Sequence, residues 1–247
     1  MEKYLVIGNP IEHSLSPKLH NFWMKKNNID AIYEKQKILD SDLKNLIIKV
    51  QKREISGINV TVPFKKKVID YLDKLSPGSE ITQSVNTISL DGKNLIGYNT
   101  DINGFELAIK NINFNVLNKK ILILGAGGVV SSIIFALKKL KAQQIIVSNR
   151  TKEKAENLKK LFKDIEIINW GNVPDFDLII NATSVGLKKD DKISLDLSKI
   201  NKGKFFYDVI YNPKETNFLK EAKKLGNEIE NGKKMFIYQA AAAFELW

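Results

Sequence analysis

The stretch that most limits what this chain can fold into runs from Lys119 to Ser132, with the sequence KKILILGAGGVVSS. Its four apolar residues, 121–124, are typical of a short and fully buried strand. The glycines that follow permit a turn that bulky side chains would block, and a helical apolar pattern then runs from Val129 to Leu140. A strand, a glycine turn and a helix together form a unit whose helix N-terminus binds a pyrophosphate. Because the spacing is G-x-G-G and not the full dinucleotide fingerprint, an ordinary strand-to-helix turn remains an alternative.

The residues at the end of the next expected strand favour NADP over NAD. That strand covers 144–148, and Asn149, Arg150 and Thr151 follow it. An acidic residue at this place would bind the ribose 2′-hydroxyl of NAD. An amide, a guanidinium and a hydroxyl stand there instead, and these groups suit a 2′-phosphate. The alternative is that Thr151 only caps the next helix and Arg150 is a surface residue.

Strands and helices alternate through the rest of this half of the chain. Three further strands and two further helices are expected, at 166–168, 178–181 and 205–209 and at 151–162 and 214–225. This alternation is typical of an α/β protein with a doubly wound parallel sheet. The polar segment 181–186 would leave the carboxyl edge of that sheet, where ligands bind in such folds.

Two domains are expected, with the boundary near Asp101. Residues 1–101 mix strands with helices and would form an N-terminal α/β domain. Residues 102–230 would form a Rossmann-type, doubly wound domain around the glycine turn. A last helix is expected to open near Asn231 and to run to Trp247.

Composition narrows the class of protein. There is no cysteine, which excludes disulfides and thiolate chemistry and agrees with a cytoplasmic protein. The two histidines, His13 and His20, are too few for a multi-histidine metal site, so no metal is expected. No apolar run reaches the length of a membrane span, and no secretion signal opens the chain, so no membrane partner is expected.

The net charge of +11 raises the question of nucleic acid as a partner. The lysines are scattered along the expected helices, and aromatic residues do not interleave with them as in a nucleic-acid surface. We therefore expect no nucleic-acid partner. A lysine-rich surface around a site for anionic small molecules is the better interpretation.

Two stretches of the N-terminal half carry candidate site residues. Ser16 followed by Pro17 indicates a helix start, and Ser14 and Ser16 offer hydroxyls where a helix N-terminus favours an anion. The alternative is capping and nothing more. Further along, Pro63 ends a strand, and Lys65 is expected at the start of a helix.

The charge state of Lys65 is the second question in this half. The positive end of the helix dipole and two neighbouring lysines favour its neutral form, in which it can exchange a proton. The alternative is a solvated lysine run. Asp101 precedes a later helix and either balances that helix's dipole or pairs with a lysine and sets its charge.

Taken together, the motifs resemble those of the shikimate dehydrogenases. Singly they are weak, but they follow one another in the family's order over nearly the whole chain. They are G-N-P-I-x-H-S-L-S-P (8–17), N-V-T-V-P-F-K (59–65), V-N-T (85–87), N-T-D-x-x-G (99–104), G-A-G-G (125–128), N-R-T (149–151), N-A-T-S-x-G (181–186), Y-D-V-I-Y-N-P-x-E-T (207–216) and N-G-x-x-M-x-x-x-Q-A (231–240).

The resemblance implies reversible, NADPH-dependent reduction of 3-dehydroshikimate to shikimate, in the biosynthesis of chorismate and aromatic amino acids. Hydride would pass between nicotinamide C4 and the ring carbonyl carbon. Lys65 and Asp101 would be the catalytic pair, with Lys65 giving the proton to the carbonyl oxygen. Residues 1–101 with about 231–247 would then be the substrate domain, and 102–230 the NADP domain.

The resemblance also implies the binding residues. Ser14 and Ser16 would hold the substrate carboxylate, and Tyr211 would lie near the substrate. The substrate hydroxyls would be bound by Thr61, Asn86, Asp101 and Gln239. The cofactor would be bound by the turn Gly125, Ala126, Gly127 and Gly128, by Asn149, Arg150, Thr151 and Lys154 at its 2′-phosphate, and by Thr183 and Gly232 elsewhere.

The chain departs from the family's usual pattern at three places. Val129 and Val130 replace small residues after the glycine turn, and Lys154 stands where an arginine is usual. Lys233 and Lys234 replace a Leu-Gly pair. Three alternatives remain open: a quinate/shikimate dehydrogenase that uses NAD, a non-catalytic relative that binds shikimate-like ligands, and, more distantly, a nucleic-acid-binding module. A monomer or a homodimer is expected.

Overall fold

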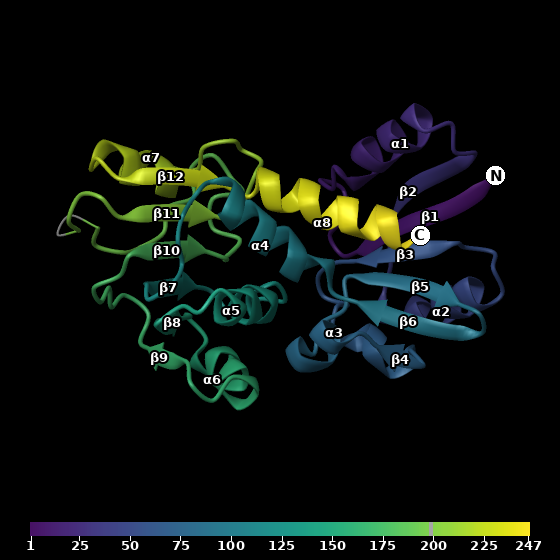
Figure 1. Cartoon of the computed structure of the whole chain (residues 1–247), viewed down its shortest axis with the longest axis horizontal. Helices are drawn as coiled ribbons and strands as arrows, with labels where there is room; N and C mark the ends of the chain where they lie inside the picture. Colours follow the sequence, from purple (N-terminus) through teal and green to yellow (C-terminus); the bar gives the residue numbers. More distant parts are fainter. Residues whose placement is uncertain (198–199) are drawn as a thin grey trace. The chain divides into compact units, whose positions relative to one another are not determined.

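The computed structural model describes residues 1–197 and 200–247 and divides the chain into two compact units. Unit 1 consists of Met1–Gly104 with Ile237–Trp247, and unit 2 of Phe105–Phe236. The chain passes from unit 1 to unit 2 within helix α4 (Thr100–Asn111) and comes back within helix α8 (Lys233–Leu246). Both helices are labelled in Figure 1.

Unit 1 is built on a mixed sheet with the strand order β2-β1-β3-β5-β6-β4. The pairs β1–β2, β1–β3 and β4–β6 are parallel, and β3–β5 and β5–β6 are antiparallel. The strands are β1 Glu2–Gly8, β2 Ala31–Lys37, β3 Gly57–Val60, β4 Lys74–Leu75, β5 Thr87–Asp91 and β6 Asn94–Tyr98. The helices that belong wholly to this unit are α1 Ser16–Lys26, α2 Leu43–Gln51 and α3 Pro77–Thr82, with 3₁₀ turns η1 Asp40–Asp42 and η2 Lys67–Tyr71.

The two faces of this sheet carry different cores. Because side chains alternate along a strand, β1 sends Leu5 and Ile7 to an aliphatic core that includes the apolar stripe of α2. It sends Tyr4 and Val6 to the other face, where an aromatic cluster packs under α1 and the end of α8. Trp247 closes this cluster and donates from Nε1 to the carbonyl oxygen of Ile88 at 3.1 Å.

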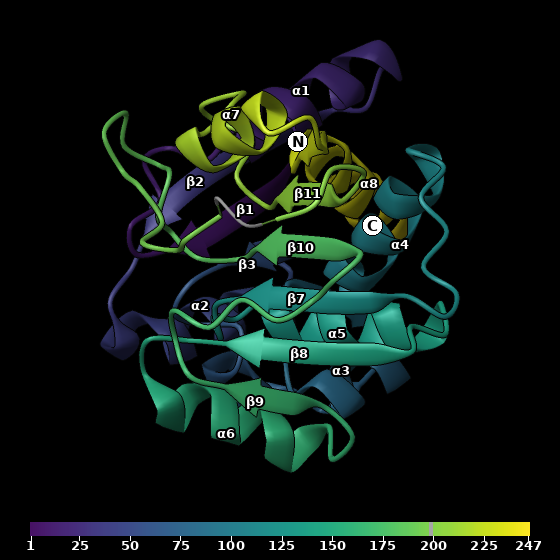
Figure 2. The same ribbon diagram turned by 90° about the vertical axis from the view of Figure 1, so that its left-hand side faces the viewer.

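Unit 2 is built on a sheet with the order β12-β11-β10-β7-β8-β9, and every described pair in it is parallel. In Figure 2 the strands β10, β7 and β8 lie side by side with their arrowheads at the same edge. The strands are β7 Lys120–Leu124, β8 Gln144–Ser148, β9 Glu166–Ile168, β10 Leu178–Asn181, β11 Phe205–Asp208 and β12 Glu228–Asn231. The helices are α5 Val130–Lys139, α6 Lys152–Leu161 and α7 Asn217–Lys224.

The predicted fold class is confirmed, since both units are α/β, unit 2 has the parallel doubly wound sheet, and the C-terminal helix ends in unit 1. Helix α3 begins at Pro77, with Ser76 as its N-cap. The Ser76 hydroxyl accepts from the N–H of Ser79, and Pro77 opens the helix with its preset φ. The strands β4 and β12 were not predicted, because both are short and half exposed. None of the helices in the described part of the chain combines the length and the hydropathy needed to cross a bilayer.

Candidate active site

The glycine turn follows β7 at the carboxyl edge of the sheet in unit 2. Gly125 has φ +111°, which is strained for other residues, and its N–H donates to the carbonyl oxygen of Ser148 at 2.8 Å. A Cβ at this position would lie 2.8 Å from the carbonyl oxygen of Ala182, so the loop after β10 packs directly against the turn. Gly127 is exposed, and a Cβ there would meet nothing closer than 3.9 Å. The turn therefore leaves open backbone in front of the N-terminus of α5, as a phosphate-binding turn requires.

The four residues predicted at the 2′-phosphate follow β8 or lie in the first turn of α6. Asn149 is half-buried and donates from Nδ2 to the carbonyl oxygen of Thr151 at 2.7 Å. Arg150, Thr151 and Lys154 are exposed, and Thr151 stands at the N-cap of α6 without a side-chain capping bond. Glu153 is the one acidic residue in the first turn of this helix. Three cationic or hydroxyl groups are thus exposed together at the end of β8.

Three further predicted residues lie elsewhere in unit 2. The Thr183 hydroxyl donates to Oδ1 of Asn181 at 2.7 Å. The ring of Tyr211 stacks on that of Phe236 with centroids 4.7 Å apart. A Cβ at Gly232 would lie 1.9 Å from the carbonyl oxygen of Val209, so close backbone packing by itself requires a glycine there.

In unit 1 the structure brings Lys65 and Asp101 together as an ion pair. The Lys65 ammonium donates to Oδ2 of Asp101, and the two side chains are only 12% and 8% exposed. The other oxygen of the carboxylate, Oδ1, accepts from Nδ2 of Asn86 at 3.0 Å. Asp101 is in the first turn of α4, where the helix dipole also favours a carboxylate. One cation and one amide therefore fix both oxygens of Asp101.

Asn86 is the centre of a wider hydrogen-bond network. Its Oδ1 accepts from the N–H of Thr100 at 2.8 Å, which fixes the orientation of the amide so that Nδ2 faces Asp101. The same Nδ2 lies 3.4 Å from Oε1 of Gln239 on α8. Asn86 and Gln239 are thus placed beside the ion pair by two different segments of the chain.

The serines of the 8–17 motif lie in the segment that follows β1, and Thr61 directly follows β3. Ser14 is half-buried, and its hydroxyl accepts from the N–H of Ser16 at 3.3 Å. Helix α1 begins at Ser16 with Leu15 at the N-cap, so the prediction that Ser16 caps this helix was wrong. Thr61 is half-buried, and its N–H donates to the carbonyl oxygen of Ile7 at 2.9 Å.

The expected position of Lys65 at a helix start was also wrong. Only a short 3₁₀ turn, η2, forms in this segment, and it begins two residues later at Lys67. A dipole effect on Lys65 is therefore small, because a 3₁₀ turn of five residues aligns few peptide units. The local environment of Lys65 is set by Asp101, which holds the ammonium in place.

Sequence reasoning missed three buried polar residues near the predicted site residues. The Tyr33 hydroxyl donates to Oδ1 of Asn59 at 2.6 Å, and Asn59 in turn donates to Thr87 at 2.9 Å. Asp208 is fully buried at the end of β11. Asn59 and Asp208 could have been found from their positions inside the motifs 59–65 and 207–216, whereas no motif contains Tyr33.

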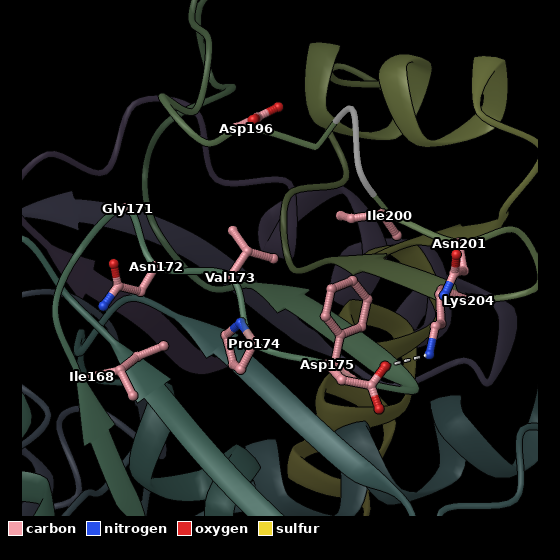
Figure 3. A pocket seen from close by; sticks show the side chains of 11 residues that line it. Ile168, Gly171, Asn172, Val173, Pro174, Asp175, Asp196, Ile200, Asn201 and Lys204 are labelled. Atoms are coloured by element: carbon pink, nitrogen blue, oxygen red, sulfur yellow. Dashed lines mark hydrogen bonds and ion pairs between the residues drawn. The ribbon is translucent and has the colours of Figure 1, made fainter.

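A cavity of about 680 Å³ lies in unit 2 away from every predicted site residue. Figure 3 shows its lining, in which the Lys204 ammonium pairs with Asp175 at 2.9 Å near the buried ring of Phe176. Its lining comes from the crossing between β9 and β10 and from described residues of the crossing between β10 and β11. Within residues 1–197 and 200–247, no group of three or more histidine and carboxylate side chains is placed to hold a metal ion.

Two protein-family models match the chain. The model described as the shikimate dehydrogenase substrate binding domain matches residues 6–88, and the model described as shikimate / quinate 5-dehydrogenase matches residues 106–213.

Known relatives match over almost the full length. A shikimate dehydrogenase (NADP(+)) from Pelagibacter ubique (strain HTCC1062) is 60% identical, over 99% of this chain and 92% of that protein. A crystal structure of a shikimate dehydrogenase in complex with NADP+ is 36% identical, with a TM-score of 0.94 over 100% of this chain and 90% of that chain. The shikimate 5-dehydrogenase of Thermus thermophilus, crystallised with NADP(H) and shikimate, is 32% identical, with a TM-score of 0.91 over 100% of this chain and 93% of that chain.

Proposed function

The chain belongs to the shikimate dehydrogenase family, and we propose that Lys65 and Asp101 are the residues that move the proton in its reaction. The protein is an NADP-dependent shikimate dehydrogenase, an oxidoreductase that reversibly reduces 3-dehydroshikimate to shikimate with NADPH. The observation that carries the proposed roles is the buried ion pair of Lys65 with Asp101, oriented by Asn86.

The ion pair gives each partner a distinct role. Lys65 has three N–H donors, and its bond to Asp101 uses one of them. A second donor is then available for the substrate carbonyl oxygen, to which Lys65 delivers a proton as negative charge develops there. In the oxidation direction the same amine takes the proton from the hydroxyl group. Asp101 holds the ammonium and accepts from a substrate hydroxyl.

The cofactor site in this proposal is the edge of unit 2. When bound, NADPH supplies the hydride, from C4 of its nicotinamide, to the ring carbonyl carbon of the substrate. The residues fit this cofactor, because the turn at Gly125 and Gly127 leaves backbone open and the N-terminus of α5 favours a pyrophosphate. Arg150, Thr151 and Lys154 are exposed and Asn149 beside them is half-buried. Together these four residues would hold the 2′-phosphate. Thr183 and Gly232 are the remaining residues that we assign to cofactor binding.

The substrate site in this proposal is built mainly from unit 1. Ser14 and Ser16 bind the carboxylate. Thr61, Asn86, Asp101 and Gln239 bind the ring hydroxyls. Tyr211 is the further residue that we assign to the substrate. Many fixed donors and acceptors are what a polyhydroxylated anion needs. Unit 1 would thus be the substrate domain and unit 2 the NADP domain.

The cellular setting belongs to the same proposal. The reaction places the enzyme in the biosynthesis of chorismate and aromatic amino acids. A cysteine-free chain suits the reducing cytoplasm, where we place the enzyme as a monomer or a homodimer.

The test measures the absorbance of the reduced nicotinamide after purified protein is mixed with a substrate and a cofactor. Shikimate is tried with NADP+ and with NAD+, and quinate is then tried with each cofactor in the same way. We expect turnover with shikimate and NADP+ and much less with the other pairs. A folded protein that binds shikimate without any turnover would be a non-catalytic relative. Faster turnover of quinate with NAD+ than of shikimate with NADP+ would indicate a quinate/shikimate dehydrogenase that uses NAD.

A further inference from the structure

Asp208 is a buried carboxylate that the proposed reaction does not use. It is the last residue of β11, and its side chain is inaccessible to solvent. Oδ1 accepts from the N–H of Ile210 at 2.9 Å and from Nδ2 of Asn181 at 3.1 Å, and Oδ2 accepts from the Thr216 hydroxyl at 2.6 Å. All three donors are neutral. Burial outweighs these bonds and raises the pKa of Asp208 to about 6.

Asn181 continues this arrangement toward the glycine turn. It lies opposite Asp208 in the β10–β11 register and opposite Leu124, the residue before Gly125, in the β10–β7 register. Its Nδ2 donates to Asp208 and to the carbonyl oxygen of Val185 at 3.1 Å. Its Oδ1 accepts from both the N–H and the hydroxyl of Thr183. One amide therefore shapes the loop 182–186 and takes its own orientation from Asp208.

That loop is one wall of the glycine turn. The N–H of Ala182 donates to the carbonyl oxygen of Leu124 at 2.8 Å, and a Cβ added at Gly125 would lie 2.8 Å from the carbonyl oxygen of Ala182. Figure 2 shows β11, β10 and β7 ending at the same edge of the sheet. A shift of the loop 182–186 would narrow or widen the space beside the backbone N–H groups of the glycine turn.

We propose that Asp208 is a positioning residue for the cofactor, and that it acts through Asn181 to hold the loop 182–186 against the glycine turn. This inference rests on the proposed function, since it takes the glycine turn as the NADP site. It assigns a role to Asn181, Asp208 and Thr216, three polar residues of the motifs 181–186 and 207–216 that have no part in the proposed reaction. Thr216 links Asp208 to helix α7, because its hydroxyl donates to Asp208 and also caps that helix by accepting from the N–H of Leu219.

The deciding experiment is NADPH binding to the intact enzyme, measured by the fluorescence of the reduced nicotinamide in the absence of substrate. For Asp208→Asn we expect the dissociation constant for NADPH to rise about tenfold, which is the effect of losing one hydrogen bond to a charged group. The KM for shikimate and kcat at saturating NADP+ should change less than about twofold. A general loss of structure would raise both KM values together.

Asp177→Asn is the matched control. Asp177 precedes the same strand β10 at the opposite edge of the sheet, where its Oδ2 accepts from the N–H of Lys120 at 2.9 Å. It should leave NADPH binding unchanged. If Asp208→Asn does not fold, Thr216→Val removes one donor to Asp208 and should weaken NADPH binding in the same direction.

Three results would overturn the inference while wild-type turnover remains. The first is an unchanged NADPH affinity in Asp208→Asn. The second is that Asp177→Asn weakens NADPH binding as much as Asp208→Asn does. The third is that Asp208→Asn lowers the affinities for NADPH and for shikimate by the same factor. A double variant, Asp208→Asn with Thr216→Val, should bind NADPH no more weakly than Asp208→Asn alone, because both act through one carboxylate. Failure of the proposed function looks different, since the wild-type protein would then show no NADP-dependent turnover.

Discussion

The two units each bury a carboxylate near their proposed ligand site, but they surround it differently. Asp101 in unit 1 is 5% exposed and faces the Lys65 ammonium and the Asn86 amide. Asp208 in unit 2 is fully buried and faces an amide, a hydroxyl and a backbone N–H. A carboxylate beside a cation holds in place a group that can exchange a proton with the substrate, whereas one surrounded by neutral donors has no such group beside it and orients the neighbouring loop through its hydrogen bonds. The same side chain thus serves chemistry in one unit and loop geometry in the other.

The most severe test of this comparison is Lys65→Met, which removes the proton donor and leaves Asp101 buried without a cation. We expect kcat to fall about 10⁴-fold, the upper end of what a general acid contributes. Shikimate dehydrogenation at saturating substrates measures the loss, and circular dichroism checks the fold. Lys67→Met is the matched control, because Lys67 pairs with Asp40 at the exposed surface and should leave kcat unchanged. Comparable losses in both variants would contradict the assignment of Lys65.

Asp101→Asn tests the carboxylate itself and should lower kcat about 10³-fold, because the Lys65 ammonium loses its partner and its orientation. Asp208→Asn serves as the comparison, since it removes an equally buried charge with no cation attached. Steady-state kinetics with both substrates varied should give a kcat defect for Asp101→Asn and a cofactor-binding defect for Asp208→Asn. If both variants lost kcat alike, the division of roles between the two carboxylates would be wrong.

The sequence predicted one of these surroundings better than the other. The strands of unit 2 were recognisable because parallel buried strands appear as apolar runs, and the glycine turn marks the edge that binds ligands. The local setting of Lys65 left proton exchange and a solvated lysine run both open, and it predicted a helix start that the chain does not form. The catalytic role is what the family motifs imply. The burial of Asp208 was not predictable, because its partners Asn181 and Thr216 reach it from 27 and 8 residues away. Ser16 was expected to cap helix α1, but the helix begins at Ser16 itself and Leu15 is the N-cap.

Asp208→Asn should also alter the pH dependence of stability. Burial raises the pKa of Asp208 from its usual 3.8 to about 6, so the folded state keeps a proton that the unfolded chain releases. The free energy of unfolding of the wild type therefore contains a contribution that is complete below pH 3.8 and lost as the pH rises to about 6, about 3 kcal/mol in total. Urea unfolding between pH 4 and 7 should show this decline in the wild type and not in Asp208→Asn. Parallel curves for the two proteins would contradict it.

His20 in unit 1 should show the opposite slope. Its ring is fully buried, stacks on Tyr33 at 4.2 Å, and has no hydrogen-bond partner for either nitrogen in the described structure. Burial lowers the pKa of His20 from 6.5 to about 4, so stability is present above pH 6.5 and falls by about 3 kcal/mol as the pH drops to about 4. His20→Phe should remove that fall in urea unfolding. The exposed His13, replaced by Phe, should leave it in place. An identical acid decline in wild type and His20→Phe would show that another group is responsible.

The smallest effect is expected for Arg150→Ala, which separates direct from indirect contributions to cofactor binding within unit 2. Arg150 is exposed at the end of β8, and nothing in the described structure suggests that it supports the fold. Losing one guanidinium from an exposed phosphate site should raise the KM for NADP+ about tenfold and leave the KM for NAD+ unchanged, because NAD+ has no 2′-phosphate. Asp208→Asn should weaken both cofactors equally, since the loop that Asp208 holds lies against the pyrophosphate turn that NAD+ and NADP+ share. A loss of NAD+ binding in Arg150→Ala would instead mean that Arg150 contacts a part of the cofactor common to both. The ratio of the two KM values thus distinguishes a residue that binds the cofactor from one that only shapes its site.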